Sequence, residues 1–374
     1  MTVDFKTEVE KRKDAMLEDL FALLRINSER DDSKADKEHP FGPGPVKALE
    51  HFLAMAERDG YKTRNIDNYA GDFEFGEGDE VLGIFAHLDV VPAGSGWDTD
   101  PYEPVIKDGR LYARGSSDDK GPTMACYYAL KIIKELGLPV SKKVRFIVGT
   151  DEESGWGDME YYFAHNGLKD PDFGFSPDAE FPIINGATYL AKFLNQFAFE
   201  GAAKAYLETA ANVLHGDFAG KNLGVAYTDE KMGALSMNAG VFKFDRNSDN
   251  NTITLNFRYP QGTDAQTIKA ELEKLNGVTK VILSDHEHTP HYVPADDPLV
   301  ATLLSVYEKQ TGLKGYEQVI GGGTFGRLLK RGVAFGAMFP DYVNTMHQAN
   351  EFADVEDLYR AAAIYAEALY ELIK

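Results

Sequence analysis

The chain of 374 residues lacks several features that would each define a class of protein. It has one cysteine, Cys126, which excludes an intrachain disulfide framework and a cysteine-rich zinc module. Any metal site must therefore use histidine and carboxylate side chains. No apolar run approaches the roughly 20 residues that span a bilayer. Because the N-terminal segment mixes acidic and basic residues, unlike a signal peptide, we expect a soluble cytoplasmic protein with no membrane partner.

Positive charge is also scarce, since 39 Lys and Arg residues stand against 60 Asp and Glu residues and leave a net charge of −21. This charge repels nucleic acid and anionic lipid, and no Lys/Arg cluster offsets it locally. We therefore expect no nucleic-acid partner. A solvated acidic surface accounts for most of the excess, although carboxylates gathered in a cleft would also suit divalent cations.

Apolar residues make up 43% of the chain, enough for the cores of two domains. Helical spacing of apolar residues predicts a helix over 8–25, and PFGPGP opens a second helix that runs to about Arg58. Farther along, helical stretches alternate with the short apolar runs VLGIFAHLD, VRFIVGTDEE, FGFSPDAE and VAFGAMFP. This alternation predicts an α/β fold with a mixed, mostly parallel sheet covered by helices.

The interval from 187 to 290 has a different character. Its alanine-rich first part predicts a helix, NTITLNFRYP an alternating strand, residues 264–275 a helix and KVILS a strand. The interval is therefore predicted to be an α+β domain, inserted into an α/β domain made of 1–186 and 291–374. The final segment, EDLYRAAAIYAEALYELIK, is apolar almost all round and should pack on the sheet.

Three of the apolar runs end in side chains that can bind metal. The first ends in His87 and Asp89, the second in the acids 151–153, and the third in Asp178. Ligands of open α/β sheets bind beyond the carboxyl ends of the strands, so we expect these side chains to converge there.

His87 and Asp89 are two residues apart, which places both side chains on one face of a strand. A carboxylate in this position can hold the second ring nitrogen of a metal-bound imidazole. Taken alone, however, such a pair more often marks an ordinary histidine at a strand end.

Asp118 and Asp119 lie between a glycine turn and a helix in the segment ARGSSDDKGP. Adjacent buried carboxylates repel each other unless a cation or a shared proton relieves them. One carboxylate that bridges two metal ions would meet this need. The other interpretation, which suits one of the two acids, is a helix N-cap.

Glu152 and Glu153 are neighbours, so their side chains diverge. One can bind metal while the other accepts a proton from an attacking water, which is the division of work that metal-assisted hydrolysis needs. The alternative is a solvated acidic turn, and the position at a strand end counts against it. His347, in NTMHQANE, adds a second imidazole, so that each of two metals gains one nitrogen, a set that suits zinc.

Seven segments resemble the M20 family of metallopeptidases in order and spacing: HLDVVPAGSGW, GRLYARGSSDDKGP, GTDEES, SPDAEFPIING, RYPQGTD, GGGTFGR and TMHQANE. Within the family, the chain is most similar to the dipeptidase V group of bacterial cytosolic, Xaa-His or carnosinase-like dipeptidases. The resemblance covers nearly the whole chain. It implies a zinc-peptidase-like catalytic domain of residues 1–186 and 291–374, interrupted by a lid domain of residues 187–290.

The resemblance also implies a ligand set for two zinc ions, with manganese or cobalt as alternatives. His87 and Asp178 would bind one ion, Glu153 and His347 the other, and Asp118 would bridge them. The family has an unusual cis peptide after the residue that matches Asp118.

Further roles follow from the same resemblance. Glu152 would be the general base, with Asp89 as the partner behind the metal ligands. Arg258 matches a lid arginine that clamps the C-terminal carboxylate of the substrate, a task for a planar two-pronged donor. The glycine-rich loop that approaches the substrate matches Gly322, Gly323 and Thr324.

The sequence departs from the family pattern at one junction, where Gly186 runs directly into Ala187. The first part of the lid, with the histidine that stabilises the oxyanion, is expected here and is missing. His215 is the nearest candidate, but we interpret it as structural or exposed. We interpret His286, His288 and His291 as an exposed hinge and place Cys126 in the core.

These observations predict a dipeptidase that acts on short peptides with a free C-terminal carboxylate. The shortened lid also allows a variant that binds metal and peptide but cleaves poorly. An amidohydrolase acting on N-acyl amino acids would use the same metal ligands. The dipeptidase V resemblance favours a monomer over a dimer.

Overall fold

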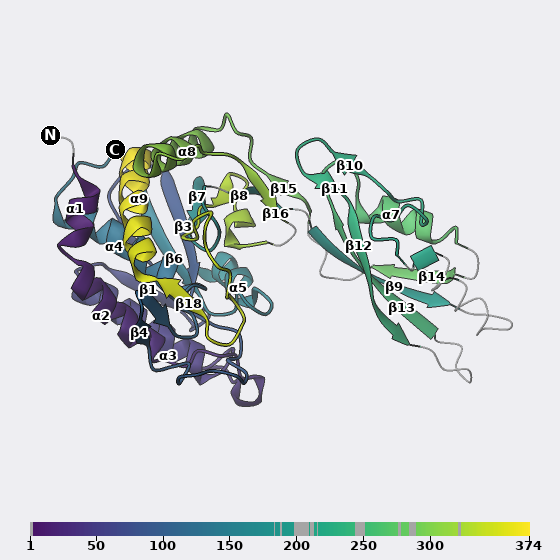
Figure 1. The fold of residues 1–374 in the computed structure, drawn as a ribbon, viewed down its shortest axis with the longest axis horizontal. Coiled ribbons are helices and arrows are strands. Elements are labelled where there is room, and N and C mark those ends of the chain that lie inside the picture. The colour runs from purple at the N-terminus through teal and green to yellow at the C-terminus, as the bar shows by residue number, and fades with distance from the viewer. Residues whose placement is uncertain are drawn as a thin grey trace. The chain divides into compact units, whose positions relative to one another are not determined.

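A computed structural model describes residues 3–182, 184–187, 189–197, 209, 213–214, 216–243, 251–275, 278–283, 289–320 and 323–374. They form two compact units (Figure 1). The first unit comprises Met1–Ile184, Val293–Glu317 and Thr324–Lys374, and the second comprises Asn185–Tyr292 and Gln318–Gly323. The assignment of catalytic and lid roles to such units stays a prediction.

The first unit is built on a sheet whose strands run in the order β1-β2-β6-β3-β7-β17. Their bounds are β1 (Thr63–Ile66), β2 (Ala70–Phe75), β6 (Lys143–Gly149), β3 (Val81–His87), β7 (Phe173–Ser176) and β17 (Gly332–Ala334). β3 is parallel to β6 and β7, and β7 is parallel to β17, whereas β2 is antiparallel to both of its neighbours. The predicted mixed sheet is therefore confirmed, with parallel pairing among these six strands confined to β6, β3, β7 and β17.

Helices cover both faces of this sheet because its strands are apolar on both sides. In β3, Ile84 belongs to the large core under the helices of one face, whereas its neighbour Phe85 packs with Met159 and Tyr162 on the other. The helices of the first unit are α1 (Phe5–Glu10), α2 (Lys13–Leu24), α3 (Pro43–Arg58), α4 (Lys120–Glu135), α5 (Gly157–His165), α8 (Pro298–Thr311) and α9 (Val355–Ile373). Short elements complete it: η1 (Asp32–Lys34), η3 (Phe325–Leu328) and a sheet of β18 (Phe352–Asp354), β5 (Arg110–Tyr112) and β4 (Val105–Lys107).

The helix predictions hold with one correction. α3 begins at Pro43 and ends at Arg58, as expected. α9 is buried along most of its length, lies beside α4 and α8 (Figure 1), and stacks Tyr365 on Phe175 of β7. The single helix predicted over 8–25 is wrong, because the chain leaves helical geometry at Arg12, whose guanidinium pairs with Glu8 and with Glu135 of α4.

The second unit contains a four-stranded antiparallel sheet in the order β12-β13-β9-β14, with a core of its own. The strands are β12 (Ser236–Lys243), β13 (Asn251–Tyr259), β9 (Tyr189–Phe197) and β14 (Val278–Leu283). The predicted strands in β13 and β14 and the helix α7 (Ala265–Leu272) are confirmed. A hairpin joins β10 (Thr228–Asp229) to β11 (Gly233–Ala234), and β8 (Ile184–Ala187) pairs with β15 (His291–Tyr292) and β16 (Gln318–Ile320).

The helix predicted from Ala187 is wrong over 189–197, where the chain forms β9 instead. β9 is a central strand that pairs with β13 on one side and with β14 on the other. These long-range ladders outweigh a local helix preference, which is worth only tenths of a kcal/mol per residue. Across the part of the chain that the structure describes, no helix combines the length and apolar character needed to cross a membrane.

Candidate metal centre

The site lies where parallel strands of the first unit end. β3 ends at His87, β6 ends at Gly149 just before the acids 151–153, and β7 ends at Ser176 just before Asp178. Because the three strands are parallel neighbours, their carboxyl ends share one edge of the sheet.

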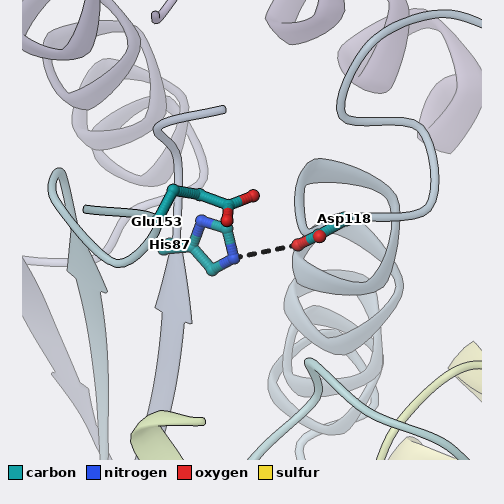
Figure 2. A group of neighbouring side chains, drawn as sticks. All are labelled: His87, Asp118 and Glu153. Carbon is teal, nitrogen blue, oxygen red and sulfur yellow. Dashed lines mark hydrogen bonds and ion pairs between the residues drawn. The ribbon is translucent and has the colours of Figure 1, made fainter. Parts of the chain in front are cut away.

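Asp118 lies between two imidazoles. Its Oδ1 is 3.2 Å from Nε2 of His87, and its Oδ2 is 2.9 Å from Nε2 of His347. Each imidazole has a further carboxylate near the same nitrogen, since Asp178 Oδ2 lies 3.7 Å from His87 and Glu153 Oε1 lies 3.2 Å from His347. Figure 2 shows His87 facing Asp118 at the start of α4, with Glu153 beside it. The arrangement is that of a carboxylate shared between two ligand pairs.

The structure contains two groups of potential metal ligands, and within each group the ligand atoms all lie within 4.8 Å of one another. The first is His87, Asp118 and Glu153, and the second is His87, Glu152 and Asp178. Histidine nitrogen with carboxylate oxygen suits zinc and other first-row divalent ions. Glu152, which the sequence suggests as a base, thus lies close enough to act as a ligand as well.

The electrostatics of the cluster favour a cation. Burial, together with neighbouring carboxylates, raises the pKa of Asp178 and of Glu152 well above the usual range, and burial also raises that of Glu153. Burial opposes ionisation of Asp118 as well, but hydrogen bonds with His347 and His87 outweigh it and lower its pKa. A divalent ion would relieve this concentration of negative charge, so the residues fit a metal centre.

The two imidazoles reflect the same excess of carboxylate. Hydrogen bonds with Asp118 and Glu153 raise the pKa of His347 to about 10. Burial would lower the pKa of His87, but hydrogen bonds with Asp118 and Asp89 raise it well above its usual range. Since metal ions compete with protons for imidazole nitrogens, the same positions suit a divalent cation.

Asp89 joins the strand that carries His87 to the loop that carries the two glutamates. Its Oδ1 accepts a hydrogen bond from the backbone N–H of Glu152 at 3.1 Å, and its Oδ2 accepts one from that of Glu153 at 3.1 Å. His87 Nδ1 lies 3.1 Å from the carbonyl oxygen of Asp89 and 3.4 Å from its Oδ1. Asp89 therefore orients the glutamate backbone as well as the imidazole.

The peptide bond between Asp118 and Asp119 is cis. Asp119 occupies the N-cap position of α4, but its side chain does not cap the helix. Instead, its Oδ2 accepts hydrogen bonds from the N–H of His87 at 3.2 Å and from Oγ1 of Thr123 at 2.9 Å. The N-cap interpretation thus applies to the backbone position alone.

None of the predicted substrate-binding residues that the structure describes belongs to these two ligand groups. Arg258 is exposed on β13 of the second unit, where it lines a cavity of about 330 Å³ with Ser236, Asn238, Asn256 and Met237. Gly323 is exposed, and Thr324 caps η3 through its hydroxyl, which accepts from the N–H of Gly326. Gly322 lies outside the described residues.

The structure describes two of the remaining positions, Cys126 and His291. Cys126 is fully buried on α4, as expected for a core residue. His291 forms part of β15 and is half-buried, so its interpretation as an exposed hinge residue is wrong. His215, His286 and His288 lie outside the described residues, so their predicted roles stay predictions.

Sequence reasoning assigned no role to several residues that hold the site in place. Buried Asp158 accepts hydrogen bonds from the N–H groups of Thr150 and Asp151, and Arg30 pairs with Asp151 at 2.5 Å. Glu351 is buried between the loops of Asp118 and His347. Glu351 ends the segment TMHQANE, but nothing in its sequence spacing distinguishes it from an ordinary surface glutamate.

Comparison with known proteins gives a consistent result. Residues 83–371 match the family described as peptidase family M20/M25/M40. The chain is 40% identical over 470 residues to a Beta-Ala-Xaa dipeptidase of Lactobacillus delbrueckii subsp. lactis, with 100% of this chain and 99% of that protein covered.

Two solved structures share the fold. Human carnosine dipeptidase 1 matches with a TM-score of 0.69 and 16% identity, over 99% of each chain. The YXEP protein of Bacillus subtilis, described as a dinuclear metal-binding peptidase of the M20 family, matches with a TM-score of 0.65 and 12% identity. The alignment covers 97% of this chain and 99% of that one.

Proposed function

Because this chain belongs to peptidase family M20/M25/M40, we propose that it is a metal-dependent dipeptidase whose centre holds two zinc ions. The observation that carries the proposal is the position of Asp118, whose two oxygens face two different imidazoles. The reaction class is supported by the Beta-Ala-Xaa dipeptidase of Lactobacillus delbrueckii subsp. lactis, with which the whole chain aligns. Manganese or cobalt would suit the same ligands.

The proposed ligands divide between the two ions. His87 and Asp178 would hold one, Glu153 and His347 would hold the other, and Asp118 would be a ligand common to both. When bound, the two ions supply Lewis acidity for the peptide carbonyl and acidify a water molecule. This division agrees with the distances between the ligand atoms.

Glu152 is the proposed general base. It is the direct neighbour of a proposed ligand, and burial raises the pKa of its carboxyl group above the usual range, which favours acceptance of a proton by its carboxylate. Asp89 holds the backbone of both glutamates and so sets the direction of the Glu152 side chain. The proton of the attacking water passes to the Glu152 carboxylate and from there to the leaving amine.

Arg258 is the proposed recognition group for the C-terminal carboxylate of the substrate, because a guanidinium binds a carboxylate through two parallel hydrogen bonds. Its exposure on β13 leaves it accessible to a ligand. The backbone of 322–324 is proposed to approach the substrate as well. The second unit then acts as a lid and the first unit as the catalytic domain, in a cytoplasmic and monomeric enzyme.

The test is a hydrolysis assay of zinc-loaded protein over a panel of dipeptides, including β-alanyl dipeptides, with the metal content measured beside it. We expect turnover that Glu152→Ala abolishes. Dipeptides amidated at the C-terminus should be poor substrates if Arg258 reads the carboxylate. Faster cleavage of N-acyl amino acids than of any dipeptide would identify an amidohydrolase instead.

A second candidate is a form that binds metal and peptide but cleaves slowly. The alignment with the Lactobacillus protein spans 470 positions, 96 more than this chain has residues, which favours a segment missing from this chain. In the family resemblance, the missing part contains an oxyanion-stabilising histidine, and loss of one such donor costs about a hundred- to a thousandfold in rate. Calorimetry that shows dipeptide binding, with the dipeptide recovered intact, would favour this candidate.

A further inference from the structure

Glu351 is a fully buried carboxylate that touches no proposed metal-ligand side chain, yet it joins the loops that carry two of them. It stands four residues after His347 and directly before β18. Burying an ionised carboxylate is costly unless its oxygens are hydrogen-bonded and its charge is balanced. The hydrogen-bond donors around Glu351 therefore indicate its role.

Nearly all of those partners come from the loop that leads to Asp118. Oε1 accepts hydrogen bonds from the backbone N–H of Ser117 at 2.9 Å, the hydroxyl of Ser117 at 2.9 Å, and the N–H of Asp118 at 3.2 Å. Oε2 accepts from Gly115 N–H at 3.1 Å and from Arg114 Nη1 at 2.6 Å. Five donors occupy the roughly four acceptor sites of a carboxylate, so no lone pair is left for a metal.

The backbone around Glu351 makes the same connection. Its carbonyl oxygen accepts from the N–H of Ala113 at 3.2 Å, and the next residue begins β18, which pairs with β5. Arg114 is 1% exposed and supplies the positive charge. His347 itself has φ 61°, a left-handed backbone conformation that a residue other than glycine adopts only when its surroundings hold it.

We propose that Glu351 is a positioning residue that fixes Asp118 between His87 and His347 and holds the Asp118 loop in register with the His347 loop. It acts on the metal ligands through the backbone N–H groups of 115–118 rather than by touching metal or substrate. The inference rests on the proposed metal centre and is independent of which substrate the enzyme cleaves. Partners that orient metal ligands typically change metal affinity by about 10- to 100-fold when they are lost.

Glu351→Asp is the most direct variant, because it keeps the charge but shortens the side chain by one methylene. The shorter carboxylate cannot reach Arg114 and the N–H groups of Ser117 and Asp118 together. Glu351→Gln keeps the length but places an amide NH₂ against N–H donors. Asp72→Asn is the matched control, since Asp72 is also fully buried and bonds Arg64 and Tyr162 outside the metal cluster.

The measurement is a titration of metal-free protein with Zn²⁺ against a competing chromophoric chelator, alongside the absorption spectrum of the Co²⁺-loaded protein and the thermal midpoint of the metal-free form. We expect Glu351→Asp and Glu351→Gln to weaken binding of at least one ion by about 10- to 100-fold and to shift the cobalt spectrum. Asp72→Asn should lower the midpoint and leave affinity and spectrum unchanged. A general loss of stability would not produce this contrast.

A folded Glu351→Asp with wild-type zinc affinity and an unchanged cobalt spectrum would overturn the proposal. If neither Glu351 variant folds, Ser117→Ala decides, because it removes one hydrogen bond to Glu351 without leaving a charge unpaired. Reduced zinc affinity in Ser117→Ala supports the positioning role, and wild-type affinity refutes it. Wild-type protein that binds no metal would contradict the proposed function itself, an outcome separate from either of these.

Discussion

At the scale of single residues, the neighbours Glu152 and Glu153 offer the sharpest test of roles. Their backbone N–H groups share Asp89 as acceptor, but only Glu153 contacts His347. We expect Glu152→Gln to lower kcat by about a hundred- to ten-thousandfold while both ions stay bound, since it removes only proton transfer. Glu153→Gln should instead lose one ion. Turnover on a dipeptide and metal content by mass spectrometry measure both.

The pair acts as its own control, because each substitution removes one negative charge from the same loop. Glu152 also belongs to a potential ligand group with His87 and Asp178. Loss of an ion from Glu152→Gln, with turnover restored by excess zinc, would show that Glu152 is a ligand and that another group is the base.

The sequence predicts the candidate metal ligands better than it predicts the residues that hold those ligands in place. His87, the 151–153 acids and Asp178 can be found because metal-binding residue types follow buried strands. Glu351 cannot be found in this way, because its partners lie more than 230 residues earlier in the chain and are mostly backbone N–H groups. No side-chain pattern marks a residue that binds backbone.

At the scale of elements, the segment before α3 stabilises the loops that carry the site. Ser28 Oγ donates to the carbonyl of Leu88 at 2.6 Å, and Arg30 Nη1 contacts Asp151 Oδ1 at 2.5 Å. We expect Arg30→Met to lower the free energy of unfolding by about 1–3 kcal/mol, because Asp151 would stay buried with less compensation. Urea denaturation followed by tryptophan fluorescence measures the loss.

The double variant Arg30→Met with Asp151→Asn removes the uncompensated charge. It should recover part of the lost stability, as expected when the cost comes from an unpaired carboxylate rather than from lost packing of Arg30 on Phe41. A double variant less stable than the sum of both single changes would contradict this account.

The contact between α3 and α4 predicts that the stability of the protein depends on pH. Asp59, at the end of α3, bonds Lys131 and Tyr127 of α4 at 2.7 Å each. Burial opposes its ionisation, but these bonds and Arg58 lower its pKa to about 2. Because the folded pKa lies below the unfolded one, the stabilisation is complete above about pH 4 and is lost as pH falls toward 2.

The measurement is the difference in unfolding free energy between wild type and Asp59→Asn from pH 6 to pH 3. We expect a difference on the order of 1 kcal/mol at pH 6, a value that already allows for screening of the partly exposed Asp59 by solvent. The difference should shrink toward pH 3. Cys126→Ala, a core substitution that removes no carboxyl group, is the control whose effect should not change over this range. A difference for Asp59→Asn that grows on acidification would refute the assignment.

The parallel sheet strands of the first unit could be predicted because their apolar sequences match their buried positions in the fold. β3 is buried along its whole length and is apolar up to its last residue, and β6 is buried at every residue after its first. β9 could not be predicted, since its strand conformation depends on β13 and β14, whose pairing residues lie about 50 to 90 positions later. At the break between α1 and α2, Arg12 also has a partner far along the chain, Glu135 of α4.

At the scale of the whole molecule, the chain covers its relatives almost from end to end but with fewer residues. The Gly186–Ala187 junction lies in β8, where these two residues pair with Tyr292 and His291 of β15. The sequence predicts a shortened lid at this junction, and the alignment with the Lactobacillus relative spans 96 positions more than this chain has residues.

The predicted shortening of the lid leads to the last prediction. Inserting the extra segment of the Lactobacillus dipeptidase between Gly186 and Ala187 should raise kcat by about a hundred- to a thousandfold if that segment supplies an oxyanion donor. Zinc affinity should stay the same, because the proposed ligands all lie in the first unit. A glycine-serine insertion of equal length controls for the interruption of β8. An equal rate in both insertions would mean that this chain already stabilises the oxyanion with its own residues.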